Sequence, residues 1–338
     1  MSAPAFVHLH LHSEFSLVDG LVRIKPLAGR AKEAGHVALA LTDQANLFAA
    51  IKFYRASRGA GIKPILGCEL LIRGADDADP LNRLVVLCRN QAGYMSLTRL
   101  ISRSYREGQL RGVATLYREW LDGHVDGLIA LSAGREGDVG RALLSGQDDL
   151  AESLAKGWSE TFGGDYFLEL IRTGRPQEEE CLHASVALAE RLGLPVVATN
   201  DVRFIDADDF EAHEARVCIM DGRVLADPRR PRNYSEEQYL RSPEEMVALF
   251  EDIPEALANT VEIARRCNLE LVLDKPQLPE FPIPAGMTTD EYFIDASRKG
   301  LEERFTVLLK ANDPEVEAKR KEYAERLEIE LKVITQMG

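Results

Sequence analysis

The feature that most constrains the fold is a series of short apolar runs separated by stretches with helical periodicity. The runs are apolar at successive positions, which is typical of strands buried on both faces in parallel sheets with helical crossovers. Seven such strand–helix units within about 200 residues favour a closed, TIM-like β/α barrel over an open doubly wound sheet. We predict seven strands, at residues 6–12, 37–42, 63–72, 83–88, 127–132, 165–171 and 194–200.

Helix signals lie between these runs. The segment 24–35 has Pro26 in its first turn and Gly35 just past its end, which are common helix start and stop signals. Asn46 is the expected N-cap of a helix over 46–59. Further helical stretches are expected at 93–105, 138–144, 178–193 and 242–267.

Residues 274–286 contain four prolines, which predicts an extended linker between two domains. We therefore expect a first domain over 1–273 and a second region over 287–338. The last helical stretch reaches Gly338 without a capping signal, so we expect the chain to be a piece of a longer protein. The second region holds two helical stretches, at 289–309 and 314–337.

Composition limits the possible partners and compartment. The formal net charge of −14 repels phosphate backbones, so the chain alone should bind DNA poorly. Two basic segments, 99–111 and 223–233, are interpreted as solvated faces. The sequence has no apolar run of about 18 residues and no secretory signal, so no membrane partner is expected. Five widely spaced cysteines without a CxxC pair indicate a reducing cytoplasm.

The first predicted strand, "FVHLHLH", contains three alternating histidines. Alternate residues share one face of a strand, and their Cα atoms are about 6.5 Å apart. The imidazoles of His10 and His12 can therefore bind one ion, whereas His8 should lie one layer deeper as a neutral, hydrogen-bonded residue. A single histidine in a strand is usually structural, but burying several on one face is costly without partners. The pattern favours a present or ancestral metal site.

Other polar residues should reach the same place. In a parallel barrel the carboxyl ends of the strands form the functional mouth. Asp43 and Gln44 follow the second predicted strand, Glu69 lies in the third, and Asp201 follows the seventh. Nitrogen and carboxylate ligands together suit Zn²⁺ or Mn²⁺.

Several long blocks resemble a known family. They are "FVHLHLHSEFSLVDGL", "ALTDQANLFAAIKFYRASRGAGIKPILGCEL", "LELIRTGRP" and "LPVVATNDVRFIDADD". In this order they are similar to the N-terminal PHP (polymerase and histidinol phosphatase) region of the bacterial DNA polymerase III alpha subunits, the C-family replicative polymerases. The resemblance implies a distorted seven-stranded barrel of PHP type. Fully equipped members have up to nine ligands for three metals and hydrolyse phosphodiesters. Residues 287–338 would then begin the polymerase palm domain.

The resemblance also assigns metal-ligand positions. His10, His12, Glu69 and Asp201 correspond to the ligand set of one metal position, and Asp19 to a ligand of another. Four further positions depart from the family pattern, which implies that the other two metal positions are degenerate. At most one divalent cation is expected, Zn²⁺ or Mn²⁺ ahead of Mg²⁺, and the site could be metal-free. The departing residues are Gln44, Arg83, Gly134 and Arg203.

Two hypotheses follow. In the first, the chain is a non-catalytic scaffold that stabilises a replicative DNA polymerase and docks a separate proofreading exonuclease. The full-length protein would be a DNA-directed DNA polymerase, a nucleotidyltransferase of DNA replication, which meets DNA only through its other domains and joins the rest of the polymerase III core. In the second, the chain is an active metal-dependent phosphoesterase or 3′–5′ proofreading exonuclease. A stand-alone phosphatase is less favoured, because the segment beyond the proline linker has no place in it.

Overall fold

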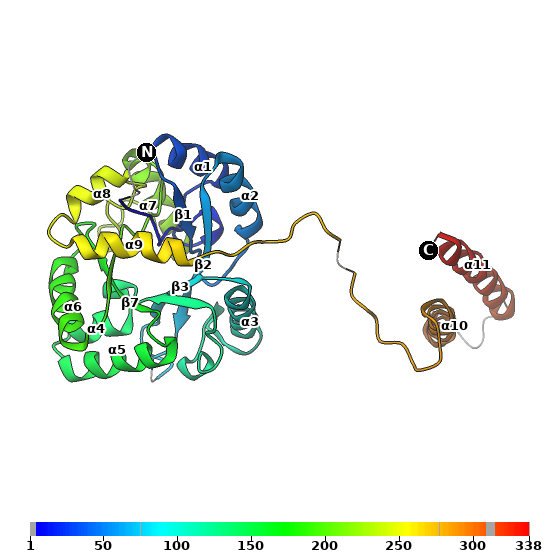
Figure 1. Cartoon of the computed structure of the whole chain (residues 1–338). Coiled ribbons are helices and arrows are strands. Elements are labelled where there is room, and N and C mark those ends of the chain that lie inside the picture. Colours follow the sequence, from blue (N-terminus) through cyan, green and yellow to red (C-terminus); the bar gives the residue numbers. More distant parts are fainter. Residues whose placement is uncertain (1–4, 75, 277, 309–314, 338) are drawn as a thin grey trace. The chain divides into compact units, whose positions relative to one another are not determined.

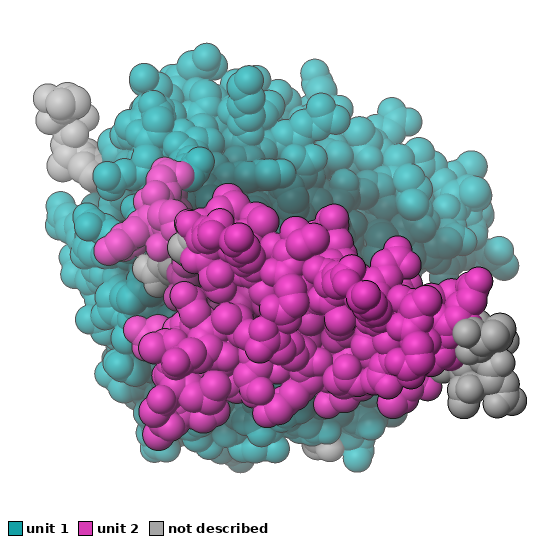
Figure 2. All heavy atoms as spheres, turned by 90° about the vertical axis from the view of Figure 1, so that its right-hand side faces the viewer, with its two compact units in different colours: residues 1–271 teal, residues 272–338 magenta. Residues whose placement is uncertain are grey.

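The structure, a computed structural model, describes residues 5–74, 76–276, 278–308 and 315–337. The chain divides into two compact units, Met1–Leu271 and Val272–Gly338, which are coloured teal and magenta in Figure 2. Within the described ranges, no helix is both long and apolar enough to cross a membrane.

A six-stranded sheet forms the centre of the first unit (Figure 1). Nearly every residue in it is buried, because helices and loops cover one face and the opposite strands cover the other. All six strands coincide with predicted apolar runs. Their order in the sheet is β1 (Ala38–Leu41), β2 (Lys63–Ile72), β3 (Asn82–Cys88), β6 (Leu128–Leu131), β7 (Tyr166–Ile171) and β8 (Val196–Thr199).

The predicted first strand, 6–12, is held by isolated bridges rather than by a regular ladder. His8 bridges Leu39 of β1, and Leu11 bridges Val202 just beyond β8. The amide of His12 donates to the carbonyl of Val202 at 2.9 Å. The N-terminal segment therefore joins the two edges of the sheet and closes it into a distorted barrel, as expected for the fold class.

One strand departs from the predicted parallel arrangement. β3 is antiparallel to both neighbours, β2 and β6, while the other pairs in the sheet are parallel. The described residues between β2 and β3, 73, 74 and 76–81, form no crossover helix, and the chain turns straight back. Arg83 consequently lies opposite Leu71, near the carboxyl end of β2. The start of β3 is thereby placed at the mouth of the barrel.

Helices surround the sheet. α5 and α7 fall outside the predicted helices, and Pro254 starts a new helix within the predicted stretch 242–267. Asn46 is not an N-cap: its Oδ1 accepts from the amide of Phe48, two residues on, and α2 begins only after Ala49. The helices are α1 (Ile24–Glu33), α2 (Ala50–Ala60), α3 (Gln91–Glu107), α4 (Asp138–Leu144), α5 (Asp148–Phe162), α6 (Glu178–Leu192), α7 (Phe210–Asp221), α8 (Pro243–Leu249) and α9 (Pro254–Arg266).

Short elements complete the first unit. A two-stranded antiparallel hairpin consists of β4 (Gln109–Leu110) and β5 (Val113–Ala114). The 3₁₀ helix η1 (Glu14–Ser16) directly follows the histidine segment. The remaining 3₁₀ helices are η2 (Arg118–Trp120), η3 (Gly134–Glu136) and η4 (Ala207–Asp209).

The second unit contains two helices, α10 (Thr289–Leu308) and α11 (Val316–Met337), at the two predicted positions. The outermost predicted residues, 309 and 314, lie outside the described residues. An ion pair between Arg298 and Glu328, at 2.8 Å, connects the two helices. The described residues of 274–286 are in neither helix nor strand.

Candidate metal centre

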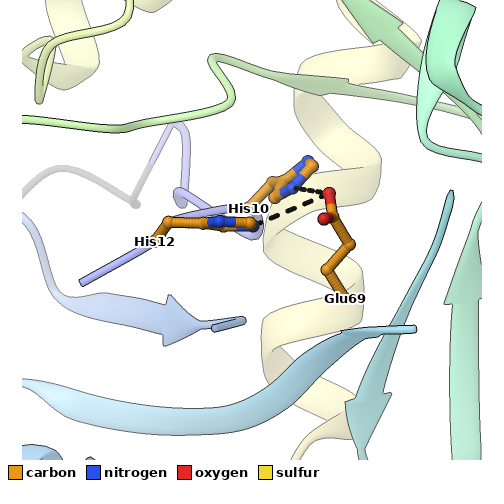
Figure 3. A group of neighbouring side chains, drawn as sticks. All are labelled: His10, His12 and Glu69. Carbon is orange, nitrogen blue, oxygen red and sulfur yellow. Dashed lines mark ion pairs between the residues drawn. The ribbon is translucent and has the colours of Figure 1, made fainter. Parts of the chain in front are cut away.

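Three potential metal ligands converge at the mouth of the barrel (Figure 3). His10 and His12 come from the N-terminal segment and Glu69 from β2, and all three are buried. The Nε2 atoms of His10 and His12 lie 3.4 and 3.6 Å from Oε2 of Glu69. Neither Nε2 atom has a hydrogen-bond partner. Because buried ring nitrogens are normally paired, this three-residue cluster could hold a metal ion.

Carboxylates orient both imidazole rings from the opposite side. Nδ1 of His10 lies 2.8 Å from Oε1 of Glu169, which also accepts from the hydroxyl of Thr199. Nδ1 of His12 lies 2.9 Å from Oδ1 of Asp19. A carboxylate on the second ring nitrogen is the usual arrangement behind a metal-ligating histidine. Nη1 of Arg203 and Oγ of Ser16 also lie 2.5 and 3.0 Å from Nδ1 of His12. The Nε2 atoms of both rings are thereby directed towards Glu69.

Arg203 is fully buried between two of the predicted ligand positions. Its Nη1 lies 2.5 Å from Oδ2 of Asp19, and its Nη2 lies 2.5 Å from Oδ1 of Asp201. The other oxygen of Asp201 contacts Arg175 at 3.1 Å and accepts from Gln238 at 2.9 Å. Asp201 lies 3.4 Å from Nε2 of His10. Both of its oxygens are nevertheless already engaged.

Glu69 is engaged in a similar way. Nη1 of Arg83 lies 3.2 Å from its Oε2, and Nε2 of Gln44 donates to its Oε1 at 3.0 Å. Arg83 also lies 3.7 Å from Asp19 and 3.5 Å from Glu136. A guanidinium keeps its charge under all ordinary conditions. Two arginines therefore supply fixed positive charge inside the cluster of potential ligands.

The pKa values of the cluster follow from this packing. Burial alone would raise the pKa of Asp201, Asp19 and Glu69, but the neighbouring arginines hold each of these pKa values well below its usual range. Burial lowers the pKa of His10, but the Glu169 and Asp201 carboxylates outweigh it and raise the pKa of His10 to about 10. A divalent cation would therefore have to displace a proton from His10.

Protein groups offset most of the buried charge of the site. Five carboxylates face three guanidinium groups and the protonated imidazole of His10, and a divalent cation that displaces the His10 proton would add one net charge. The carboxylates are Asp19, Glu69, Glu169, Glu178 and Asp201, and the guanidinium groups are those of Arg83, Arg175 and Arg203.

Two of the expected mouth residues lie elsewhere. Gly134 has no side chain to offer the site; it lies in η3 with φ of 51°, and a Cβ there would be 3.0 Å from Cδ1 of Ile171 and 3.7 Å from the carbonyl oxygen of Glu169. Glu136, two residues further on, reaches Arg83 instead. Asp43 accepts from the amide and hydroxyl of Ser13, at 2.6 and 2.8 Å, and so holds the N-terminal segment.

His8 is placed as the sequence predicts. Its Nε2 lies 2.9 Å from the carbonyl oxygen of Arg241, and the side chain is fully buried. Burial lowers the pKa of His8 to about 3, so the ring is neutral at ordinary pH. His8 therefore supports the barrel and takes no part in the cluster.

Three residues of the cluster are missing from the sequence prediction: Glu169, Arg175 and Gln238. Glu169 carried a signal, because it is the one charged residue in the buried strand "YFLELI" and a carboxylate there needs a partner. Arg175 and Gln238 lie outside regular strands and helices, where no periodicity shows which way a side chain points.

The fold and the site have the features of a PHP domain, and residues 8–173 match the family model of that domain. Among solved structures, the fold is similar to an amidohydrolase from Chromobacterium violaceum (17% identity, TM-score 0.43, 63% of this chain and 97% of that chain). It is also similar to a putative metal-dependent phosphoesterase from Bifidobacterium adolescentis (14% identity, TM-score 0.41, 59% and 88%).

Sequence relatives are more specific. DNA polymerase III subunit alpha of Pseudomonas aeruginosa is 54% identical over 334 residues, which cover 99% of this chain and 28% of the relative. The same subunit of Escherichia coli K12 is 53% identical over 338 residues, which cover 100% of this chain and 29% of the relative. The chain belongs to the DNA polymerase III alpha subunit family and contains its PHP domain, as the resemblance predicted. It spans less than a third of the length of these relatives.

Proposed function

We propose that this chain is the PHP region of a replicative DNA polymerase and acts as a non-catalytic scaffold. It would stabilise the polymerase and dock a separate proofreading exonuclease. The observation that carries the proposal is the buried Arg203, bound to both Asp19 and Asp201. The guanidinium occupies Asp19, which corresponds to a ligand of a second metal position, and one oxygen of Asp201, which corresponds to a ligand of the first; its charge repels a second ion.

The remaining donors support one ion at most. Hydrolysis by a metal cluster needs ions about 3.5–4 Å apart, one for the nucleophile and one for the leaving oxygen. In the described part of the chain, the one group of three ligands is His10, His12 and Glu69. A bound Zn²⁺ or Mn²⁺ would supply Lewis acidity there, while Mg²⁺ is disfavoured because it prefers oxygen ligands. We therefore expect a single vestigial site without phosphodiesterase activity.

The domain assignment belongs to the same proposal. Residues 1–273 would form the PHP domain, 274–286 the linker and 287–338 the beginning of the palm domain. DNA would then be met only through the other polymerase domains. The five cysteines are free and buried, which suits the reducing cytoplasm in which replication takes place.

Binding and hydrolysis assays test the scaffold role. We expect the proofreading subunit to be retained in a pull-down by this chain and by the full-length alpha subunit. We expect no release of nucleotides from a 3′-mismatched primer with Mn²⁺, Zn²⁺ or Mg²⁺. Metal analysis of the same purified protein should accompany this assay. Failure of both proteins to retain the exonuclease would overturn the docking role.

A second candidate function is a metal-dependent phosphoesterase or 3′–5′ exonuclease. The unpartnered Nε2 atoms of His10 and His12 favour it, because they leave room for a reactive ion. Its signature would be primer hydrolysis that depends on added metal and is abolished by His12→Ala. His36→Ala is the matched control, since His36 is also a buried histidine but contacts a backbone carbonyl.

A further inference from the structure

A groove on the surface of the first unit lies between α1, α2 and η1 and has a volume of about 590 Å³. α1 and α2 pack against each other, and Figure 1 shows them side by side. The floor of the groove is apolar and is formed by Phe15, Ile24 and Ala56. These side chains are buried or half-buried, so the groove is a preformed hollow in the packing of the two helices.

The rim of the groove is strongly basic. Arg23, Lys25, Lys52 and Arg55 line it, with Glu14 as its one carboxylate. This local excess of positive charge occurs in a chain whose net charge is −14. Neither Arg23 nor Lys25 makes an ion pair within the part of the chain that the structure describes. At Arg23 and Lys25 the rim therefore presents positive charge that the described residues do not neutralise.

Exposed apolar side chains lie close in sequence to residues that line the groove. Phe48 and Ile51 are 59% and 42% exposed and precede Lys52 and Arg55 by four positions. Leu17, just past η1, is 54% exposed. Exposed apolar side chains rimmed by polar ones are typical of protein interaction sites.

We propose that this groove docks a segment of another protein in which a large apolar side chain is flanked by carboxylates. The apolar side chain would fill the floor, and the carboxylates would pair with the basic rim. The inference goes beyond the scaffold function, because it assigns a docking surface and the chemistry of the segment that binds there, which the scaffold function leaves open.

Single-stranded nucleic acid fits the groove less well. Such ligands need exposed aromatic faces on which bases stack. One face of the Phe15 ring is instead occupied by Lys52, whose Nζ lies 4.7 Å from the ring centroid, so a base could not stack there, while the rest of the half-buried ring still lines the floor. The net negative charge of the chain also opposes a phosphate backbone.

Fluorescence anisotropy tests the proposal directly. The probe is a short fluorescein-labelled peptide with a central Leu-Phe pair between glutamates, titrated with the whole chain. We expect saturable binding that weakens as salt rises from about 0.05 M to about 0.5 M, because rim charges are screened. Lys25→Glu should weaken binding roughly tenfold, as expected for reversal of a rim charge.

Lys32→Glu is the matched control. It makes the same charge change on the exposed surface of α1 but lies outside the groove. We expect it to change the affinity by less than about twofold, because exposed charges outside the contact contribute little. Lys52→Glu reverses a rim charge from α2, so it provides a second test should Lys25→Glu impair folding.

Three outcomes would overturn the proposal. The first is the absence of saturable binding, and the second is an equal effect of the Lys25 and Lys32 substitutions. The third is binding of an oligothymidylate that is tighter than peptide binding and is weakened by Lys25→Glu, which would make the groove a nucleic-acid site. A peptide with lysines in place of the glutamates should not bind.

Discussion

Two pairs of buried histidines lie in the barrel at nearly the same ring separation. The centroids of His10 and His12 are 5.4 Å apart, and those of His8 and His36 are 5.1 Å apart. The first pair faces carboxylates, which raise the pKa of His10 to about 10. The second pair faces the carbonyl oxygen of Arg241, and burial lowers the pKa of His8 to about 3. The facing groups, rather than the histidines themselves, decide which pair could hold an ion.

The comparison extends to the groups behind the first pair. Asp19, Glu69 and Asp201 are themselves paired with arginines, so most of their negative charge is offset without a metal ion. The carbonyl facing His8 and His36 carries no charge and needs no such balance. Substitutions around the first pair should therefore cause the largest losses in the free energy of unfolding, because removal of one member of an ion pair leaves the other as an unpaired buried charge.

Arg203→Ala should have the largest effect. It would leave Asp19 and Asp201 buried and without their main partner, at a cost of about 3–5 kcal/mol in the free energy of unfolding. Urea unfolding followed by circular dichroism measures this. Arg30→Ala is the control, because the half-exposed Arg30–Asp206 pair should contribute less than about 1 kcal/mol. A comparable loss in both variants would break the proposed contrast between buried and exposed pairs.

Added Zn²⁺ should have the next largest effect. At a hundredfold excess over its Kd, an ion held by His10, His12 and Glu69 would stabilise the fold by about 2.7 kcal/mol. Calorimetry should show a rise in Tm of roughly 5 °C, which EDTA reverses. His12→Ala should abolish the rise in Tm on addition of Zn²⁺. His36→Ala should lower Tm without Zn²⁺ but should still show the rise when Zn²⁺ is added.

Removal of metal with EDTA sharpens the same comparison. If the arginines offset most of the negative charge of the cluster, the purified protein should lose less than about 10 °C in Tm when metal is stripped. A larger loss would mean that the ion is required for the fold, and the cluster would then not be vestigial.

The sequence predicted the strands well because double burial leaves a continuous apolar run. The prediction missed the direction of β3. A buried strand has the same local pattern in either direction, but the ten residues between the predicted strands 63–72 and 83–88 are too few for a crossover helix and were the signal of an antiparallel turn. That direction places Arg83 at the mouth, beside Glu69. The N-terminal segment was predicted as a strand, but only isolated bridges hold it.

The site was predicted in part. The convergence of His10, His12 and Glu69 follows from strand ends that meet at one mouth. The roles of Arg175 and Gln238 do not follow, because they depend on how loops fold over the mouth. Gly134 shows the limit of a resemblance. The position corresponds to a metal ligand in the family, but glycine has no ligand atom in a side chain, and Glu136 contacts Arg83 instead.

Gln44→Ala should have a smaller effect. It removes one hydrogen bond to Oε1 of Glu69, while Arg83 still pairs with Oε2 of the same carboxylate. We expect a loss of about 1 kcal/mol in the free energy of unfolding, measured with urea. A loss as large as that of Arg203→Ala would contradict the view that Arg83 is the main partner of Glu69.

The smallest effect should come from the second pair, as a change in the pH dependence of stability. Burial holds the pKa of His36 below its ordinary value of 6.5, so below pH 6.5 the unfolded chain takes up a proton that the folded chain does not. The stability contributed by the neutral ring is therefore full above pH 6.5 and is lost as the pH falls towards the folded pKa.

His36→Gln should flatten this acid-side slope by less than about 1.4 kcal/mol per pH unit, the limit for one proton. His183→Gln is the control, because His183 is largely exposed and should leave the slope unchanged. Urea unfolding at pH values from 5 to 7 measures the slope. An unchanged slope in His36→Gln would mean that His36 is protonated in the folded chain. His36 would then be charged like His10, and the two histidine pairs would differ only in the groups that face them.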